Sequence, residues 1–261
     1  MTTALRGYAA LAYGFLFLPI AVLILMSFNS ATIGLFPVEG LTGKWYAELY
    51  RDGALWNSLR NSLFVGFATV AACVPLGIMA AFALVRIRFR GQSVLTGIIL
   101  IPLIVPGILM GISMLSLFHI IGLRTSLFTV FLAHTAIALP YAALIIAARL
   151  HGLDPNLEEA ASGLGASRWG VFRKVTLPLL APGLLGAALF AFTISFGEII
   201  VTFFVSGFEQ TLPVRIWSLL RLGISPTINA ISAIIMFAGL AAIVIALRFV
   251  SSSSTQRKEQ G

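Results

Sequence analysis

The sequence carries very little charge for its length. Only 10% of its 261 residues are Asp, Glu, Lys or Arg, whereas 59% are hydrophobic. Soluble domains average about 25% charged residues. This deficit excludes a water-soluble enzyme or binding domain, and the length allows several membrane spans. The net charge of +8 does not indicate a nucleic-acid-binding protein, because the 17 basic residues are scattered between apolar runs.

Residues that form disulfides or bind metals are also scarce. Cys73 is the single cysteine and lies inside an apolar run, which excludes an intrachain disulfide and disfavours a cysteine metal site. His119, His134 and His151 are widely spaced and form no ligand set, so we expect no metal or cofactor in this chain. His134 falls within a predicted span, where it is either a hydrogen-bonded interior residue or part of a transport pathway.

A phosphate-binding loop of the form Gly-x-x-x-x-Gly-Lys-Ser/Thr is missing. The single Gly-Lys pair, Gly43-Lys44, is followed by Trp45 and lacks the upstream glycine. The chain therefore has no visible means to hydrolyse a nucleotide, and we predict no catalytic residues. If transport is driven by ATP, then ATP and Mg²⁺ must bind to another subunit.

Six apolar runs are long enough to cross a membrane, for which about 20 residues are usually needed. They lie at 11–28, 61–85, 94–118, 127–148, 179–205 and 230–250. A cleaved signal peptide is the rival interpretation of the first run, but that run is long and lacks a small-x-small cleavage site. The fold class is therefore an all-α polytopic membrane protein, with a six-helix domain over 11–250.

Several features between and within the spans are informative. Trp45 and Leu49 predict a short helix along the membrane interface after the first span. Pro140 interrupts the fourth predicted span, and Gly107 and Gly111 match the small-xxx-small pattern of helix contacts. The segments 1–10 and 251–261 lie outside the membrane, and the serine-rich tail 251–261 is expected to be disordered.

The distribution of basic residues orients the chain. Six spans place both termini on one side, and that side holds eleven Lys and Arg residues against six on the other. Cytoplasmic loops carry the excess of positive charge in membrane proteins. Both termini and the loop 149–178 are therefore predicted to be cytoplasmic.

The loop 149–178 is the longest polar interruption in the C-terminal half, and it begins as a short helix. Asp154 is a good N-cap, with Pro155 at the first helical position. Leu157, Ala160 and Ala161 share one face of this predicted helix. A helix of small side chains lets the surface of another protein approach closely.

A turn and a second short helix are predicted to complete the loop. Gly163 and Gly165 can end the first helix in a left-handed turn. Ser167 can cap the second helix, and Leu177-Pro178 is expected to stop it before the next span.

These residues resemble the cytoplasmic "EAA" loop of ABC-importer permease subunits. The pattern falls on Glu159-Ala160-Ala161, Gly165 and Val175-Thr176-Leu177-Pro178, with Val175 in place of isoleucine. The resemblance implies a type I ABC importer permease fold, with loop 155–178 inserted into a groove of a separate ATPase. It assigns this coupling role to Leu157, Glu158, Glu159, Ala160, Ala161, Gly165, Leu177 and Pro178. The rival interpretation is an ordinary amphipathic connector.

Glu198 is the only acidic residue inside a predicted span. An isolated carboxylate in lipid costs about 2.5–3.5 kcal/mol on insertion scales, so it should face water or a partner. Ser195, Phe196 and Phe203 are its neighbours in the sequence, and aromatic faces near a carboxylate suit an organic cation. These four residues form either a substrate pathway or a structural contact with a second permease chain.

The segment 211–230 resembles the same region of spermidine/putrescine-type permeases, and together with the loop the resemblance extends from the first span to the sixth. Such permeases commonly carry an acidic pair near Glu198, where this chain has Gly197. The resemblance implies a bacterial inner-membrane location and three kinds of partner: a second permease chain, giving a heterodimer; two ATPase subunits; and a periplasmic solute-binding protein. A polyamine is the leading solute, and an opine or amino-acid derivative is the alternative.

Two other classes of protein remain open. One is an ion- or proton-coupled secondary transporter in which Glu198 carries the proton; inverted repeats and several intramembrane ionisable groups would favour it, and neither is evident. The other is a non-transporting scaffold for a membrane complex.

Overall fold

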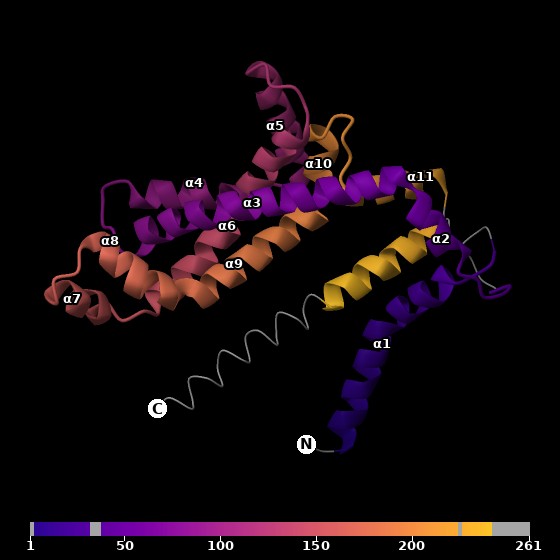
Figure 1. The fold of residues 1–261 in the computed structure, drawn as a ribbon, viewed down its shortest axis with the longest axis horizontal. Coiled ribbons are helices and arrows are strands. Elements are labelled where there is room, and N and C mark those ends of the chain that lie inside the picture. Colours follow the sequence, from indigo (N-terminus) through magenta and orange to yellow (C-terminus); the bar gives the residue numbers. More distant parts are fainter. Residues whose placement is uncertain (1–2, 32–37, 224–225, 242–261) are drawn as a thin grey trace. The chain divides into compact units, whose positions relative to one another are not determined.

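The computed structural model describes residues 3–31, 38–223 and 226–241, and these ranges are almost entirely helical (Figure 1). The helices with labels are α1 (Thr3–Ser27), α2 (Lys44–Arg51), α3 (Gly53–Val85), α4 (Gln92–Ile104), α5 (Gly107–Ile120), α6 (Leu127–His151), α7 (Asn156–Gly163), α8 (Arg168–Val171), the π-helical turn η1 (Phe172–Thr176), α9 (Leu177–Gly197), α10 (Ile200–Val205) and α11 (Leu212–Leu222). The chain divides into two compact units, Met1–Leu55 with Ile216–Gly261, and Trp56–Arg215.

In the first unit, α2 is fastened to the end of α1. The Tyr46 hydroxyl lies 2.7 Å from the Ser27 hydroxyl, and the Trp45 indole donates a hydrogen bond to the Asn29 carbonyl at 2.7 Å. Trp45 and Leu49 are buried on the inner face of α2. The predicted short helix is therefore present, but its aromatic anchor packs inside the chain.

Within the described ranges, four helices are long and apolar enough to cross a membrane: Leu5–Ser27, Gly53–Val85, Leu127–His151 and Arg168–Gly197. They match the first, second, fourth and fifth predicted spans. A shorter apolar helix covers Pro226–Ala241. The sixth predicted span, 230–250, runs beyond the described residues, as does the tail 251–261.

The third predicted span is not one straight helix. It is divided into α4 and α5, which meet at a bend of 112°. Val105 is extended, with φ −73° and ψ 126°, and Pro106 follows it. A residue before proline is pushed out of the helical region, and the proline has no N–H to continue the helix. The third predicted span, 94–118, is therefore present as two helices, and the sequence analysis did not predict the bend between them.

The predicted break at Pro140 shows the opposite error. α6 runs unbroken from Leu127 to His151 with Pro140 inside it, so the predicted interruption is wrong. Membrane helices tolerate proline when neighbouring groups satisfy the freed backbone. The fifth predicted span does break, because α9 ends at Gly197 and Glu198 is extended, with ψ 120°.

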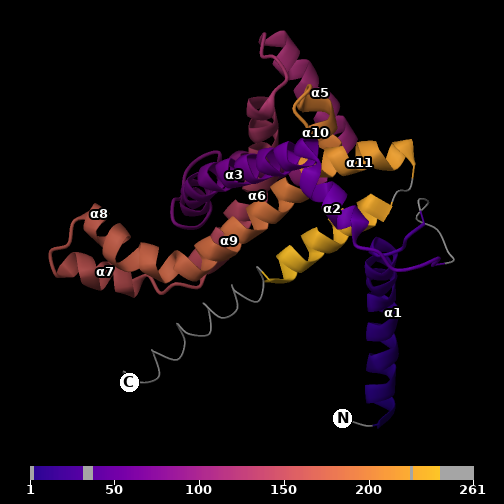
Figure 2. The ribbon, with the colours of Figure 1, turned by 45° about the vertical axis from the view of Figure 1, so that its right-hand side comes forward.

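The second unit has its core where α3, α6 and α9 meet (Figure 2). Small side chains form much of the contact between α6 and α9, among them Ala138, Ala142, Ala187 and Ala191, all fully buried. Without a hydrophobic driving force between helices in lipid, small residues stabilise such pairs by allowing close packing. Figures 1 and 2 both place α7 and α8 at one end of this unit, and α5 and α10 towards the other.

A second cluster joins α5, α6 and α10. Val130, Ala133, Val201 and Val205 are buried in it. Gly111 leaves room for the ring of Phe204, because a Cβ on that glycine would lie 2.5 Å from Phe204 Cδ2. The predicted small-residue face of α5 therefore packs against α10.

Candidate functional site

The predicted loop helix is present as α7, and its two ends are fixed by local hydrogen bonds. At its start the Asp154 carboxylate accepts from the Asn156 amide at 3.0 Å. At its end Gly165 has φ +87°, its amide donates to the Ser162 carbonyl at 2.9 Å, and the Ala166 amide donates to the Ala161 carbonyl at 3.1 Å. This pair of bonds is a Schellman motif, which needs a left-handed residue and favours glycine. Gly165 is thus the turn residue.

Gly163 is the last residue of α7 and does not adopt a positive φ, so of the two glycines predicted to form the left-handed turn only Gly165 does so. Ser167 caps the second helix as predicted, because its hydroxyl accepts from the Gly170 amide at 3.2 Å.

Leu177 and Pro178 do not stop that second helix. α8, η1 and α9 form one continuous helical run from Arg168 to Gly197. Within η1 the Leu177 amide bonds to the Phe172 carbonyl, a widened π-type turn. Pro178 directly follows this turn, and the helical run continues through it, as membrane helices permit when neighbouring groups satisfy the freed backbone. The predicted end of the helix was therefore wrong, and α9 is joined to the loop without a break.

Two adjacent carboxylates in α7 face different ways. Glu159 is exposed, whereas Glu158 is half-buried and accepts from the Thr176 hydroxyl at 2.9 Å. The outer surface of the hairpin α7–α8 also presents three large apolar side chains: Leu157 is 47% exposed, Leu164 90% and Trp169 67%. Ala160 and Pro178 are exposed, and Ala161 and Leu177 are partly buried. The structure thus places six of the predicted coupling residues, from Leu157 to Gly165, on the hairpin α7–α8, and Leu177 and Pro178 at the start of α9.

A buried polar cluster lies at the break between α9 and α10. Both nitrogens of the His134 ring are 2.8 Å from a hydroxyl, Nδ1 from Ser195 and Nε2 from Thr202. The Ser195 hydroxyl also lies 3.4 Å from that of Thr69 on α3. Beside the cluster, the Glu198 carboxylate accepts from the Val201 amide at 2.9 Å and so caps α10.

Hydrogen-bond donors fix the arrangement of protons in this cluster. The Thr202 hydroxyl donates to the Glu198 carbonyl at 2.8 Å, so its oxygen must accept from His134 Nε2. The Ser195 hydroxyl donates to Thr69 Oγ1 and its oxygen lies within hydrogen-bond distance of His134 Nδ1. His134 is therefore the hydrogen-bonded interior residue that one of the two sequence interpretations described.

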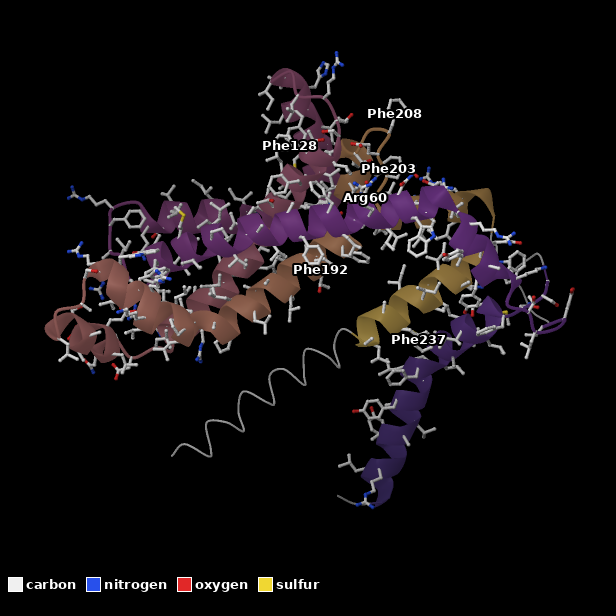
Figure 3. The ribbon with its side chains drawn as sticks, in the orientation of Figure 1. Arg60, Phe128, Phe192, Phe203, Phe208 and Phe237 are labelled. Atoms are coloured by element: carbon white, nitrogen blue, oxygen red, sulfur yellow. The ribbon has the colours of Figure 1, made fainter. Side chains whose placement is uncertain are left out.

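The predicted pathway residues are only partly brought together. Ser195 and Glu198 lie in or beside the polar cluster, but Phe196 stacks on Phe192 at 5.6 Å between ring centroids. Phe203 projects from α10 and is 52% exposed (Figure 3). Sequence reasoning missed Thr69 and Thr202, because two threonines distant from each other in the chain carry no spacing signal.

The comparisons with known proteins identify the class. The family model described as "Binding-protein-dependent transport system inner membrane component" matches residues 73–257. The chain belongs to this family, and it is a non-catalytic, multi-pass permease component of a binding-protein-dependent transport system.

Two curated relatives show which transport permeases the chain is similar to. The chain is 35% identical over 241 residues to the spermidine/putrescine transport system permease protein PotC of Haemophilus influenzae, covering 92% of this chain and 93% of the relative. It is 37% identical over 234 residues to the putrescine transport system permease protein PotI of Escherichia coli, covering 87% and 83%. Nothing in these relatives supports an ion-coupled transporter.

Solved structures share the fold. A bacterial ABC transporter that imports the acidic polysaccharide alginate matches with a TM-score of 0.68 at 18% identity, covering 95% of this chain and 97% of that one. A second match, with a TM-score of 0.67, is the alginate transporter in complex with a pentasaccharide-bound periplasmic protein; it has 16% identity and covers 93% and 92%.

Proposed function

We propose that this chain is one of two transmembrane subunits of a bacterial inner-membrane importer for a polyamine or a similar small organic cation. In this proposal the chain has six spans and both termini in the cytoplasm. The hairpin α7–α8 inserts into a groove of a separate ATPase subunit, and a periplasmic binding protein delivers the solute. ATP binding changes the relative stability of two transporter states, and the solute site opens alternately to each side.

The exposed apolar surface of the hairpin α7–α8 is the observation that carries the coupling role. Leu157, Leu164 and Trp169 leave a large part of their apolar surface uncovered on a polar hairpin with ordered ends. Aromatic and apolar anchors beside a charged residue such as Glu159 are typical of the centre of a protein–protein interface. An ordinary connector would bury these side chains or lack them.

The names of the curated relatives and the state of Glu198 support a polyamine as the solute. Both relatives named above transport polyamines according to their descriptions. Among the described residues no basic side chain pairs with Glu198, so its charge remains available to a cation. Because one carboxylate cannot neutralise a di- or trication, the second permease chain is expected to supply further acids.

Co-purification tests the assembly. The tagged chain, expressed with its neighbouring transport genes, should retain an ATPase subunit in detergent, and Glu159→Lys should release it. Glu48→Lys is the matched control, because Glu48 is equally exposed but lies on α2 in the predicted outer segment. Normal retention of the ATPase by Glu159→Lys would contradict the proposed contact.

Uptake in a deletion strain tests the solute. Radiolabelled spermidine and putrescine should enter only when the chain is restored, and uptake should require ATP. Uptake that follows the pH gradient after ATP depletion would contradict an ATP-driven importer. If an opine or an amino-acid derivative competed for uptake and polyamines did not, the proposed solute would be wrong. The proposed coupling to an ATPase would be unaffected.

A further inference from the structure

The cytoplasmic end of α3 contacts the hairpin through two side chains one helical turn apart. Phe82 lies in the last turn of α3, and Arg86 directly follows the helix, with its amide bonded to the Phe82 carbonyl at 2.9 Å. Residues at this spacing share one face. Both face the loop between α6 and α9, to which α3 has no direct connection along the chain.

Arg86 makes the polar contact. Its Nη2 lies 3.8 Å from Glu158 Oε1 and donates to the Leu153 carbonyl at 3.3 Å. The same Glu158 oxygen accepts from Thr176, which is buried in η1. One carboxylate oxygen therefore joins α7, η1 and the end of α3.

Phe82 makes the apolar contact. Its ring meets the edge of Phe172 with 6.0 Å between centroids, and Phe172 stacks on Trp169 at 5.4 Å. Trp169 is 67% exposed. A row of three rings thus runs from the outer surface of the hairpin to α3.

The Arg86 contact has an unused donor. Arg86 Nε is buried without a hydrogen-bond partner among the described residues. Buried polar groups are nearly always paired, so an unpaired one needs an explanation. Arg86 Nε is therefore a donor that the contact with Glu158 leaves unused in this arrangement.

We infer that the cytoplasmic end of α3 is clamped to the coupling hairpin at two points, Arg86–Glu158 and Phe82–Phe172, and receives its motion directly. This inference rests on the proposed function. The covalent chain carries a displacement of α7 only to α6 and α9, and the clamp adds α3. Glu158 is then a positioning residue inside the permease, while its neighbour Glu159 faces the ATPase.

The test uses the assembled transporter in lipid nanodiscs, with its second permease chain, ATPase subunits and binding protein. The double variant Phe82→Leu with Arg86→Gln breaks both contacts but keeps apolar volume at position 82. Stimulation of ATP hydrolysis by the binding protein should fall about fivefold in this variant. An effect of this size is typical of mutations in residues that couple two distant sites. Affinity for the ATPase subunit should stay within about twofold, because the outer face of α7 is unchanged.

Two further variants separate a coupling role from a merely structural one. Arg88→Gln removes a nearby exposed arginine and should leave stimulation unchanged. The exchange Arg86→Glu with Glu158→Arg should restore stimulation that Arg86→Glu alone has lost.

Unchanged stimulation in the double variant would overturn the inference, as would an equal loss in Arg88→Gln or no rescue by the exchange. Failure of the unaltered chain to bind any ATPase would instead refute the proposed function.

Discussion

The hairpin α7–α8 and the polar cluster at the α9–α10 break differ in where their side chains find partners. On the hairpin, Glu159, Leu164 and Trp169 are exposed, and the hydrogen bonds that form its turn are local. In the cluster, His134, Ser195 and Thr202 are buried and bond to one another across separate helices. The exposed hairpin fits the proposed contact with another protein, whereas the cluster holds this chain together.

This difference separates two kinds of mutational effect. A change on the outer face of the hairpin should weaken assembly without unfolding the permease, because little intrachain contact is lost. A change in the cluster should destabilise the permease without altering the hairpin. The hairpin connects the end of α6 to the start of α9, whereas His134 and Ser195 lie towards the opposite ends of these two helices. Measuring ATPase binding and thermal stability on the same variants therefore tests whether the two regions have separate roles.

The largest effect is expected from Glu159→Lys. Reversing a charge at an interface introduces repulsion or leaves a partner unpaired, and we expect at least about thirtyfold weaker binding of the ATPase subunit. Titration of the purified permease pair with the ATPase measures this. The thermal midpoint of the permease should not change; a large fall in that midpoint would show that Glu159 acts within the chain.

Gly165→Val should be next. Valine at φ +87° costs about 1–2 kcal/mol in the left-handed region and opposes the Schellman turn, which corresponds to about tenfold weaker ATPase binding. Gly163→Ala is the matched control, because Gly163 is helical and has open space around it. Equal losses in the two variants would mean that the turn geometry is unimportant.

His134→Leu should destabilise the permease and leave ATPase binding intact. It removes two buried hydrogen bonds, each worth about 0.6–1.7 kcal/mol in membrane proteins, so the thermal midpoint in detergent should fall. His119→Leu, at an exposed histidine, should leave the midpoint unchanged. Full stability of His134→Leu would contradict the structural role of the cluster.

The smallest effect is expected from Glu198→Gln. The amide oxygen can still accept from the Val201 amide, so the cap of α10 and the fold should survive. Loss of the charge should raise the apparent KM for spermidine about threefold, as for a partly solvated ion pair. Glu48→Gln serves as the control, and an unchanged KM in Glu198→Gln would remove this residue from the pathway.

The parts that sequence could predict depend on local physics. The ends of α7 follow from Asp154, Gly165 and Ser167, whose roles are set by their immediate neighbours. The sequence could not predict that the helix bends at Val105 and Pro106 but continues through Pro140. Tertiary packing decides which proline interrupts a membrane helix. The partners of His134 lie up to 68 residues away, and no spacing rule connects them.

Accessibility of a cysteine at Ser162 tests the central claim, that the hairpin is displayed to the cytoplasm for an ATPase. Ser162 is exposed on α7, and the only natural cysteine, Cys73, is fully buried, so Ser162→Cys introduces a single accessible thiol. A membrane-impermeant maleimide should label it in inside-out vesicles stripped of ATPase, but not in intact cells, and added ATPase should protect it. Labelling in intact cells would place the hairpin on the outer side and contradict the account.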